Sequence, residues 1–185
     1  MSTRRANLLN LGLLQLGCAV PLLACALDRR GAGVVLAWSV LVLAVSISEH
    51  RGRDLRLLLA GAILGTLGEL AAVLVGLMSF VHPSSPLPFP GWLPPSWALL
   101  GIATAHVLRP LRGRMLGSVI VGGLVGMLGL YGAMAAEEIV VTHGWHVVVI
   151  SGWLGVLVAL LIFVAPWLEL APRSRGRFPI HVPRR

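Results

Sequence analysis

Long apolar runs separated by short polar connections dominate the chain. Several runs reach about 20 residues, the length that an α-helix needs to cross the hydrocarbon core of a bilayer. We therefore expect an all-α membrane protein, a bundle of about six transmembrane helices. The predicted spans are residues 7–27, 33–48, 57–80, 95–111, 115–136 and 145–168. They make up one transmembrane domain over residues 1–170, followed by a basic cytoplasmic tail at residues 171–185.

The fourth predicted span differs from the others. It is short, and prolines bound it on both sides at Pro94, Pro95 and Pro110. We expect either a tilted span or one that begins in a re-entrant loop, because irregular backbone is tolerated at membrane depth only where protein surrounds it.

Arginine predicts the orientation of the bundle. All fifteen basic residues are Arg. Thirteen lie at the two termini and in the second and fourth connections, whereas only Arg29 and Arg30 lie in a connection on the other side. Because positive charge favours the cytoplasmic side, both termini are predicted to be cytoplasmic. The lysine-free, arginine-rich composition favours a bacterial inner membrane.

Composition excludes several classes of protein. The chain is 57% hydrophobic and only 12% charged. A soluble domain of this length cannot bury that much apolar surface, because much of its area must face water. The net charge of +8 is spread over short connections instead of one face with interleaved aromatics, so we expect no nucleic-acid partner. Membrane lipids are the expected partners.

The first span has an alternative reading. A basic start and an apolar run precede Ala24, Cys25 and Ala26, an A-x-A pattern typical of a cleaved signal peptide. Asn10, Gln15 and other interruptions of the apolar run favour a retained helix instead.

A carboxylate stands inside the third span, in the stretch "GTLGELAAVLVG". On a helical wheel, Glu69 lies at the edge of a face of small residues, whereas the opposite face is bulky. Small residues allow close helix packing, so we expect Glu69 to point into or along the bundle interior. The small face comprises Gly61, Gly65, Gly68, Ala72 and Gly76, and the bulky face Leu67, Leu70, Leu74, Leu77 and Met78.

The fifth span carries a similar stripe, which predicts close contact between the third and fifth spans. Its members are Ser118, Gly122, Gly126, Gly129 and Ala133.

Polar residues gather in the cytoplasmic half of the predicted bundle. With Glu69 near mid-membrane, they predict either a polar cleft that opens inward or a set of interhelical hydrogen bonds. The candidates for such a cleft are Asn10, Gln15, Thr66, Glu69, Thr104 and His106.

Cofactor and metal chemistry have weak support. His106 is the only histidine well inside a span, and a bis-histidine haem needs a second ligand at the same depth. Near the outer surface a loosely spaced group could hold a divalent metal, although a plain interfacial loop explains it more simply. This group is Glu137, Glu138, His143 and His146. We predict no metal site and no cofactor.

Three segments resemble an uncharacterised family of small bacterial inner-membrane proteins, known only as a domain of unknown function. They are "NLLNLGLLQLGCA", "LGELAAVLVGLMSF" and "SWALLGIATAHVLRPLRGR", and the resemblance covers about residues 6–170. The chain departs from the family at Ser46 or Ser48, where the family has His, and at Ala105, where it tends to have Asn. The resemblance implies no activity, but it implies a polar set of Asn10, Gln15, Glu69, Thr104 and His106.

Three functional hypotheses follow. The first is an accessory or binding membrane protein that packs in a larger complex with other membrane-protein subunits or holds a lipophilic molecule. The second is an intramembrane enzyme acting on a lipid or isoprenoid-like substrate, with Glu69 as general acid and His106 as base or orienter. Their predicted depths differ by about 10 Å at 1.5 Å per residue, which weighs against direct cooperation. The third is a proton-coupled small-molecule transporter using Glu69.

Overall fold

The computed structural model describes residues 3–84 and 86–169, except for the side chains of residues 3–7 and 10. The predicted tail at residues 171–185 and the side chain of Asn10 lie outside this description. The elements are α1 (Thr3–Ala26), α2 (Arg30–Ser46), α3 (Arg51–Leu74), β1 (Met78–Phe80), α4 (Leu93–Ala103), the 3₁₀ turn η1 (Arg109–Leu111), α5 (Met115–Ala135), β2 (Ile139–Val141) and α6 (His146–Glu169).

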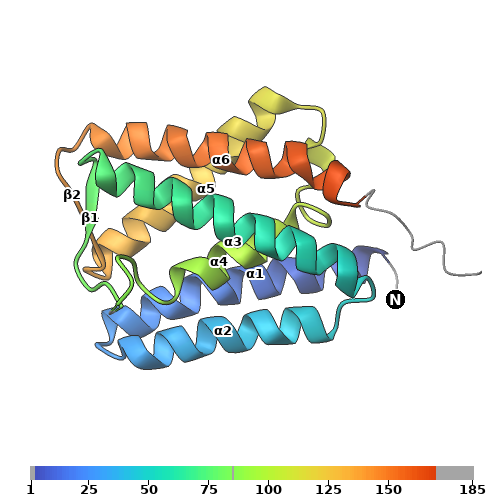
Figure 1. Cartoon of the computed structure of the whole chain (residues 1–185), viewed down its shortest axis with the longest axis horizontal. Coiled ribbons are helices and arrows are strands. Elements are labelled where there is room, and N and C mark those ends of the chain that lie inside the picture. Colours follow the sequence, from blue (N-terminus) through green and yellow to red (C-terminus); the bar gives the residue numbers. More distant parts are fainter. Residues whose placement is uncertain (1–2, 85, 170–185) are drawn as a thin grey trace, which may run out of the picture.

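The helices run back and forth along one long direction, so that α1 begins and α6 ends at the same end of the bundle (Figure 1). Below, this is the terminal end, and the end that carries the two strands is the strand end. Within the described residues, the helices α3, α5 and α6 are long and apolar enough to cross a membrane, which indicates a multi-pass membrane protein. The apolar parts of the other three are shorter, at Leu11–Ala26, Arg30–Ser46 and Leu93–Ala103.

Helix α4 is much shorter than the span predicted over residues 95–111. Its 11 residues measure about 16 Å, roughly half of a hydrocarbon core of about 30 Å. Two prolines occupy its first turn, where a missing N–H costs nothing. After Ala103 the chain makes a series of turns before η1. A single helix that reached Leu111 would need the N–H that Pro110 lacks, so residues 95–111 do not form one continuous helix.

Helix α3 ends at Leu74, not at the predicted Phe80. Gly76 has φ +76° and occupies the left-handed position that terminates helices. The N–H of Leu77 bonds to Ala72 O at 3.0 Å and that of Gly76 to Val73 O at 3.0 Å, which closes a Schellman cap. Met78, predicted on the bulky outer face, therefore lies in β1 and is buried.

The strand pair was not predicted. β1 and β2 are antiparallel, with Ser79 opposite Val140, and they tie the connection after α3 to the connection after α5. Each strand has only three residues, too few for alternation of apolar and polar positions to be recognised in the sequence.

The small face of α3 is buried from Gly61 to Ala72, as predicted, while Leu67 and Leu74 are exposed. Its main partner is α4. A Cβ on Gly61 would overlap Trp97 O and come within 2.9 Å of the Cα of Gly101. The two backbones thus touch where both helices have glycine, a packing mode common in membranes.

The predicted contact between the third and fifth spans was wrong, because α6 packs against both. Leu157 of α6 covers Gly68 of α3. On the α5 side, a Cβ on Gly122 would lie 2.6 Å from the Cβ of Val158, and one on Gly126 would lie 2.7 Å from that of Leu154. A helical wheel identifies a packing face but not which helix fills it.

Candidate functional site

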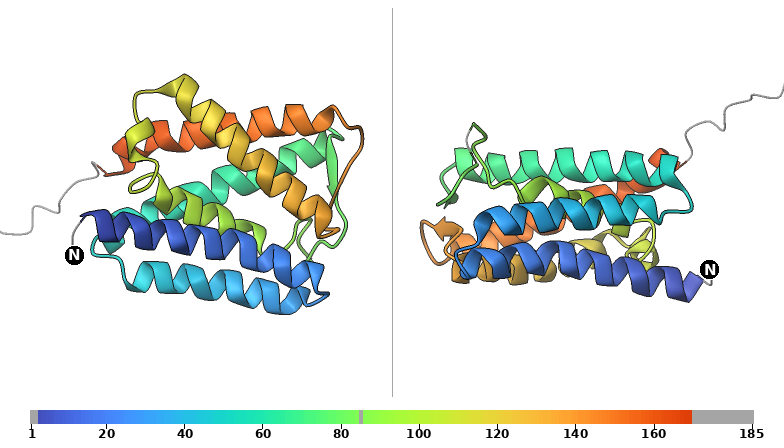
Figure 2. Two further views of the ribbon diagram at one scale, coloured as in Figure 1. Left: turned by 180° about the vertical axis from the view of Figure 1, so that it is seen from behind. Right: turned by 90° about the horizontal axis from the view of Figure 1, so that it is seen from below.

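A groove of about 590 Å³ opens between α1, α4 and α5. Seen from behind, α5 crosses the bundle obliquely and α4 is visible in the interval between α5 and α1 (left view of Figure 2). Side chains of α1 and α5 form its two sides, α4 forms its floor, and residues of α3 and α6 reach it from behind. Its surface is mostly apolar, and the described residues that line it include neither Arg nor His.

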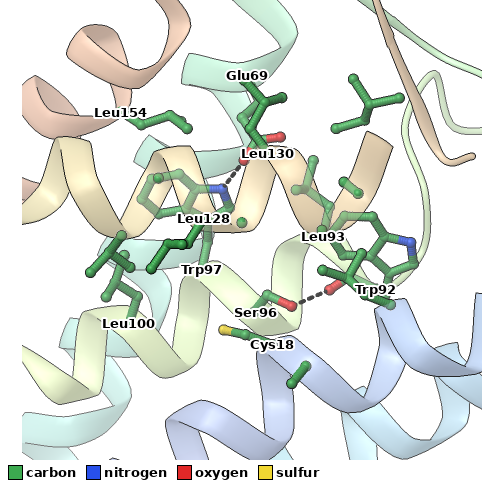
Figure 3. Close-up of a pocket in the computed structure, with 18 of the residues that line it drawn as sticks. Cys18, Glu69, Trp92, Leu93, Ser96, Trp97, Leu100, Leu128, Leu130 and Leu154 are labelled. Atoms are coloured by element: carbon green, nitrogen blue, oxygen red, sulfur yellow. Dashed lines mark hydrogen bonds between the residues drawn. The ribbon is translucent and has the colours of Figure 1, made fainter. Parts of the chain in front are cut away.

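Glu69 is the only ionisable carboxyl group that the described residues contribute to the groove wall. The indole Nε1 of Trp97 donates a hydrogen bond of 2.7 Å to its Oε1 (Figure 3). No other hydrogen bond to Glu69 comes from the part of the chain that the structure describes. One carboxyl oxygen is therefore held by Trp97, and the other accepts no hydrogen bond from the described residues.

Gly65 positions this pair. A Cβ at Gly65 would overlap Cγ, Cδ2 and Cε3 of Trp97, where the two rings of the indole join, so the indole lies directly against the backbone of α3. Glu69 follows four residues later on the same helix face, where it meets the indole N–H. The sequence "GTLGE" thus provides both the space for Trp97 and the acceptor for its N–H.

The floor of the groove carries further polar atoms. Ser96 Oγ lies 3.1 Å from Gly17 O and 2.9 Å from Trp92 O, which connects α4 to α1. Trp92 is buried and also lines the groove, and its Nε1 has no partner among the described residues. Cys18 lines the groove beside Ser96 (Figure 3).

The predicted polar set is divided by the fold. Gln15 and Glu69 line the groove, whereas Thr66, Thr104 and His106 do not. Thr66 is buried with Oγ1 unpaired among the described residues, and Thr104 Oγ1 donates to Gly101 O at 2.6 Å. Of these members of the predicted set, two therefore line the groove and three lie outside it.

His106 belongs to a second polar cluster, at the terminal end of the bundle. Its Nε2 accepts a hydrogen bond of 3.1 Å from Arg53 and lies 3.5 Å from Asp54 Oδ2. Asp54 is 3% exposed and also accepts bonds of 2.7 Å each from Ser48 Oγ and Arg53 Nε. This cluster joins α3 to the turns after α4, and it leaves Glu69 without His106 as a partner.

Sequence reasoning missed Asp54. The third span was expected to begin at Leu57, which left Asp54 in an arginine-rich loop where a carboxylate is ordinarily solvated. Helix α3 begins at Arg51 instead and buries Asp54 in its first turn. The sequence feature that could have indicated a buried Asp54 was its position as a single acidic residue among several arginines, immediately before an apolar run.

Further ion pairs fix the end of α6. Arg112 donates to both carboxyl oxygens of Glu169 at 2.6 and 3.0 Å and to Thr104 O at 3.1 Å. Arg56 donates to Leu168 O at 2.8 Å. Arginines of the terminal end therefore hold helix ends as well as carrying charge.

The weak metal candidates do not converge. Glu138 is 1% exposed and accepts a hydrogen bond of 2.9 Å from Arg30 Nε, and Arg30 also pairs with Asp28. The ring of His146 lies 3.1 Å, through Nδ1, from Leu77 O. Glu137 is exposed and ends α5 with φ +56°. Within residues 3–84 and 86–169, no three side chains of His, Cys, Asp or Glu gather as a metal site.

Comparison with known proteins gives one match. The model of the family described as "Protein of unknown function (DUF2878)" matches residues 7–163, most of the chain, and the chain belongs to this family. This confirms the resemblance to a domain of unknown function. No curated protein and no solved structure matches the chain.

Proposed function

We propose that this DUF2878 protein lies in the bacterial inner membrane and crosses it six times, the fourth time by α4 together with the turns that follow it. Both termini are then cytoplasmic, and the groove between α1, α4 and α5 holds a lipophilic molecule. The orientation rests on thirteen arginines, seven at the two termini and six in the second and fourth connections. The strand end then faces outward.

The groove is the observation that carries this proposal. Its volume of about 590 Å³ lies within the range of about 300–1,000 Å³ that is usual for small-molecule sites. Such sites combine an apolar lining with a few placed polar groups, as Glu69 and Gln15 are placed here. The exposed side chains of Leu23, Val125 and Leu128 belong to its lining, so in a bilayer its mouth opens sideways toward acyl chains.

An intramembrane enzyme has less support. General acid and base catalysis by Glu69 and His106 needs both side chains within hydrogen-bond reach of one substrate. His106 lies outside the groove lining and is engaged by Arg53. A binding role requires only the groove and its carboxyl group.

A pair of glycine substitutions tests the proposal. Gly129 lies on α5 in the groove lining, and Gly152 lies on the exposed surface of α6; at both positions the space within 4 Å of an added Cβ is open. Gly129→Leu should fill the groove without clashing with the fold, and Gly152→Leu is the matched control. Native mass spectrometry of gently extracted protein should show a small molecule on the wild type and on Gly152→Leu, and loss of it from Gly129→Leu.

Two results would contradict the binding role. One is a bound molecule that Gly129→Leu retains at the wild-type level. The other is wild-type protein with no small molecule but with stoichiometric membrane-protein subunits, which would favour the accessory role in a larger complex. Thermal unfolding of both variants checks that they fold like the wild type.

A further inference from the structure

We propose that the groove takes a neutral lipophile with a flat ring that bears a carbonyl or hydroxyl oxygen, and that this oxygen bonds to Glu69. This inference rests on the binding role proposed above and specifies its ligand. It comes from the depth of Glu69, from its second carboxyl oxygen, from the two indoles in the groove lining, and from the lack of basic residues among the described lining residues.

Depth restricts which part of a lipid can reach Glu69. The apolar part of α3 begins at Leu57, directly after Arg56. Glu69 is twelve residues further along, about 18 Å at 1.5 Å per residue, in a hydrocarbon core of about 30 Å. Its carboxyl group therefore lies close to mid-membrane, far from the interface where phospholipid headgroups reside. The polar group of the occupant has to be one that enters hydrocarbon.

Hydrogen bonding identifies the type of polar group. Trp97 occupies Oε1 of Glu69, and the second oxygen has no partner among the described residues. An ionised carboxylate at this depth is costly, whereas a protonated carboxyl group can donate its O–H to a carbonyl or hydroxyl oxygen. Glu69 is half-buried and lines the groove, so its second oxygen is accessible to an occupant, and a ligand oxygen there supplies a bond that hydrocarbon cannot.

The absence of positive charge argues against a phosphate. The described lining residues include no Arg, Lys or His, so no side chain among them can neutralise an anionic headgroup. Phosphate recognition in proteins depends on Arg, Lys or backbone N–H groups. A phospholipid would thus offer only its acyl chains to the groove and leave Glu69 unsatisfied.

The indoles favour a ring over a straight chain. Trp92 and Trp97 both line the groove, and their rings lie on either side of Ser96 (Figure 3). Offset or edge-on contacts between aromatic rings add to simple burial of area. A hydrocarbon tail attached to the ring can follow the leucines of the lining, Leu14, Leu100 and Leu128 among them, toward the open side of the groove.

Binding of an alkyl-substituted benzoquinone to the full chain in lipid nanodiscs tests the inference, with native mass spectrometry as the readout. The straight-chain alcohol with the same tail and an anionic diacyl phospholipid are the competing probes. Wild-type protein should prefer the quinone to both. Glu69→Leu should weaken quinone binding about tenfold because it removes the hydrogen bond. Glu69→Gln should bind within a few-fold of wild type, since an uncharged amide keeps a donor and an acceptor.

The outcomes separate this inference from the binding role itself. Binding that survives Glu69→Leu unchanged, or that Glu69→Gln weakens as much as Glu69→Leu does, would overturn the neutral hydrogen bond. Equal binding of the straight-chain alcohol would overturn the ring, and preference for the phospholipid would overturn the ligand class. In each case displacement by Gly129→Leu but not by Gly152→Leu would leave the groove established as a binding site. Insensitivity of all probes to Gly129→Leu would refute the binding role as well.

Discussion

The crossing of α3 and α4 gives the sharpest test of the fold, because the groove floor depends on it. Gly61→Ala adds one methyl group where α3 touches α4. Its Cβ would overlap the carbonyl oxygen of Trp97 and stand 2.9 Å from the Cα of Gly101. Both neighbours are backbone atoms, which cannot rotate away, so α4 has to move as a whole.

Two opposing effects set the expected change in the free energy of unfolding of Gly61→Ala. Overpacking a tight contact costs about 1–3 kcal/mol, and backbone neighbours place this site near 3. Replacing Gly by Ala in a helix returns about 1 kcal/mol. We therefore expect Gly61→Ala to lower the free energy of unfolding by about 2 kcal/mol. The control Gly152→Ala, on an exposed face with open space at the Cβ, should raise it by about 1 kcal/mol.

Reversible unfolding in mixed detergent micelles with increasing sodium dodecyl sulfate, followed by circular dichroism, measures both variants. The free energies of unfolding of the two variants should differ by about 3 kcal/mol. Equal stability of Gly61→Ala and Gly152→Ala would refute this expectation, because the backbones of α3 and α4 could not then be in contact. Trp97 rests on the same face of α3, so Gly61→Ala should also change its fluorescence.

Two further substitutions test the strand end. Glu137→Gly should stabilise the protein by about 1 kcal/mol, because Glu137 has φ +56° and glycine adopts this conformation without strain. Glu137→Ala is the control because it keeps the Cβ. An equal gain in stability from Glu137→Ala would show that strain at this φ is not the cause. Arg30→Gln should destabilise the protein, because it leaves the buried carboxylate of Glu138 without its cation, and a second change of Glu138→Gln should restore most of the loss. The same detergent titration measures these variants, and an unchanged midpoint for Arg30→Gln would show that the pair contributes nothing.

Helix positions were predictable from the sequence, whereas helix ends and helix partners were not. Within the described residues, each of the six predicted apolar runs contains an α-helix. A helix is the structure in which a long apolar run satisfies its own backbone hydrogen bonds. The end of α3 was misplaced because Leu77 and Met78 continue the apolar run after the helix stops. The brevity of α4 depends on turns at Thr104 and beyond that hydropathy does not detect.

The candidate site was partly predictable for the same reason. A carboxylate on the small-residue side of a helix indicated an interior position, and Glu69 does line a groove. The separation of Glu69 from His106 could not be foreseen, since it depends on α4 ending early and on Asp54 being buried. Trp97 lies near the start of the fourth predicted span, and its hydrogen bond to Glu69 requires the space that Gly65 leaves for its ring.

The ion pair between Arg30 and Glu138 bears on how the chain is made. The two residues are 108 positions apart in the sequence. Arg30 is therefore synthesised well before Glu138. With the proposed orientation, α1 and α2 insert as a hairpin that carries Arg30 across the membrane with Asp28 as its nearby counter-charge. The buried partner arrives only after α5 has crossed. Assembly of the strand end is therefore a late event in biogenesis, and the first hairpin remains incomplete until the fifth helix is in place.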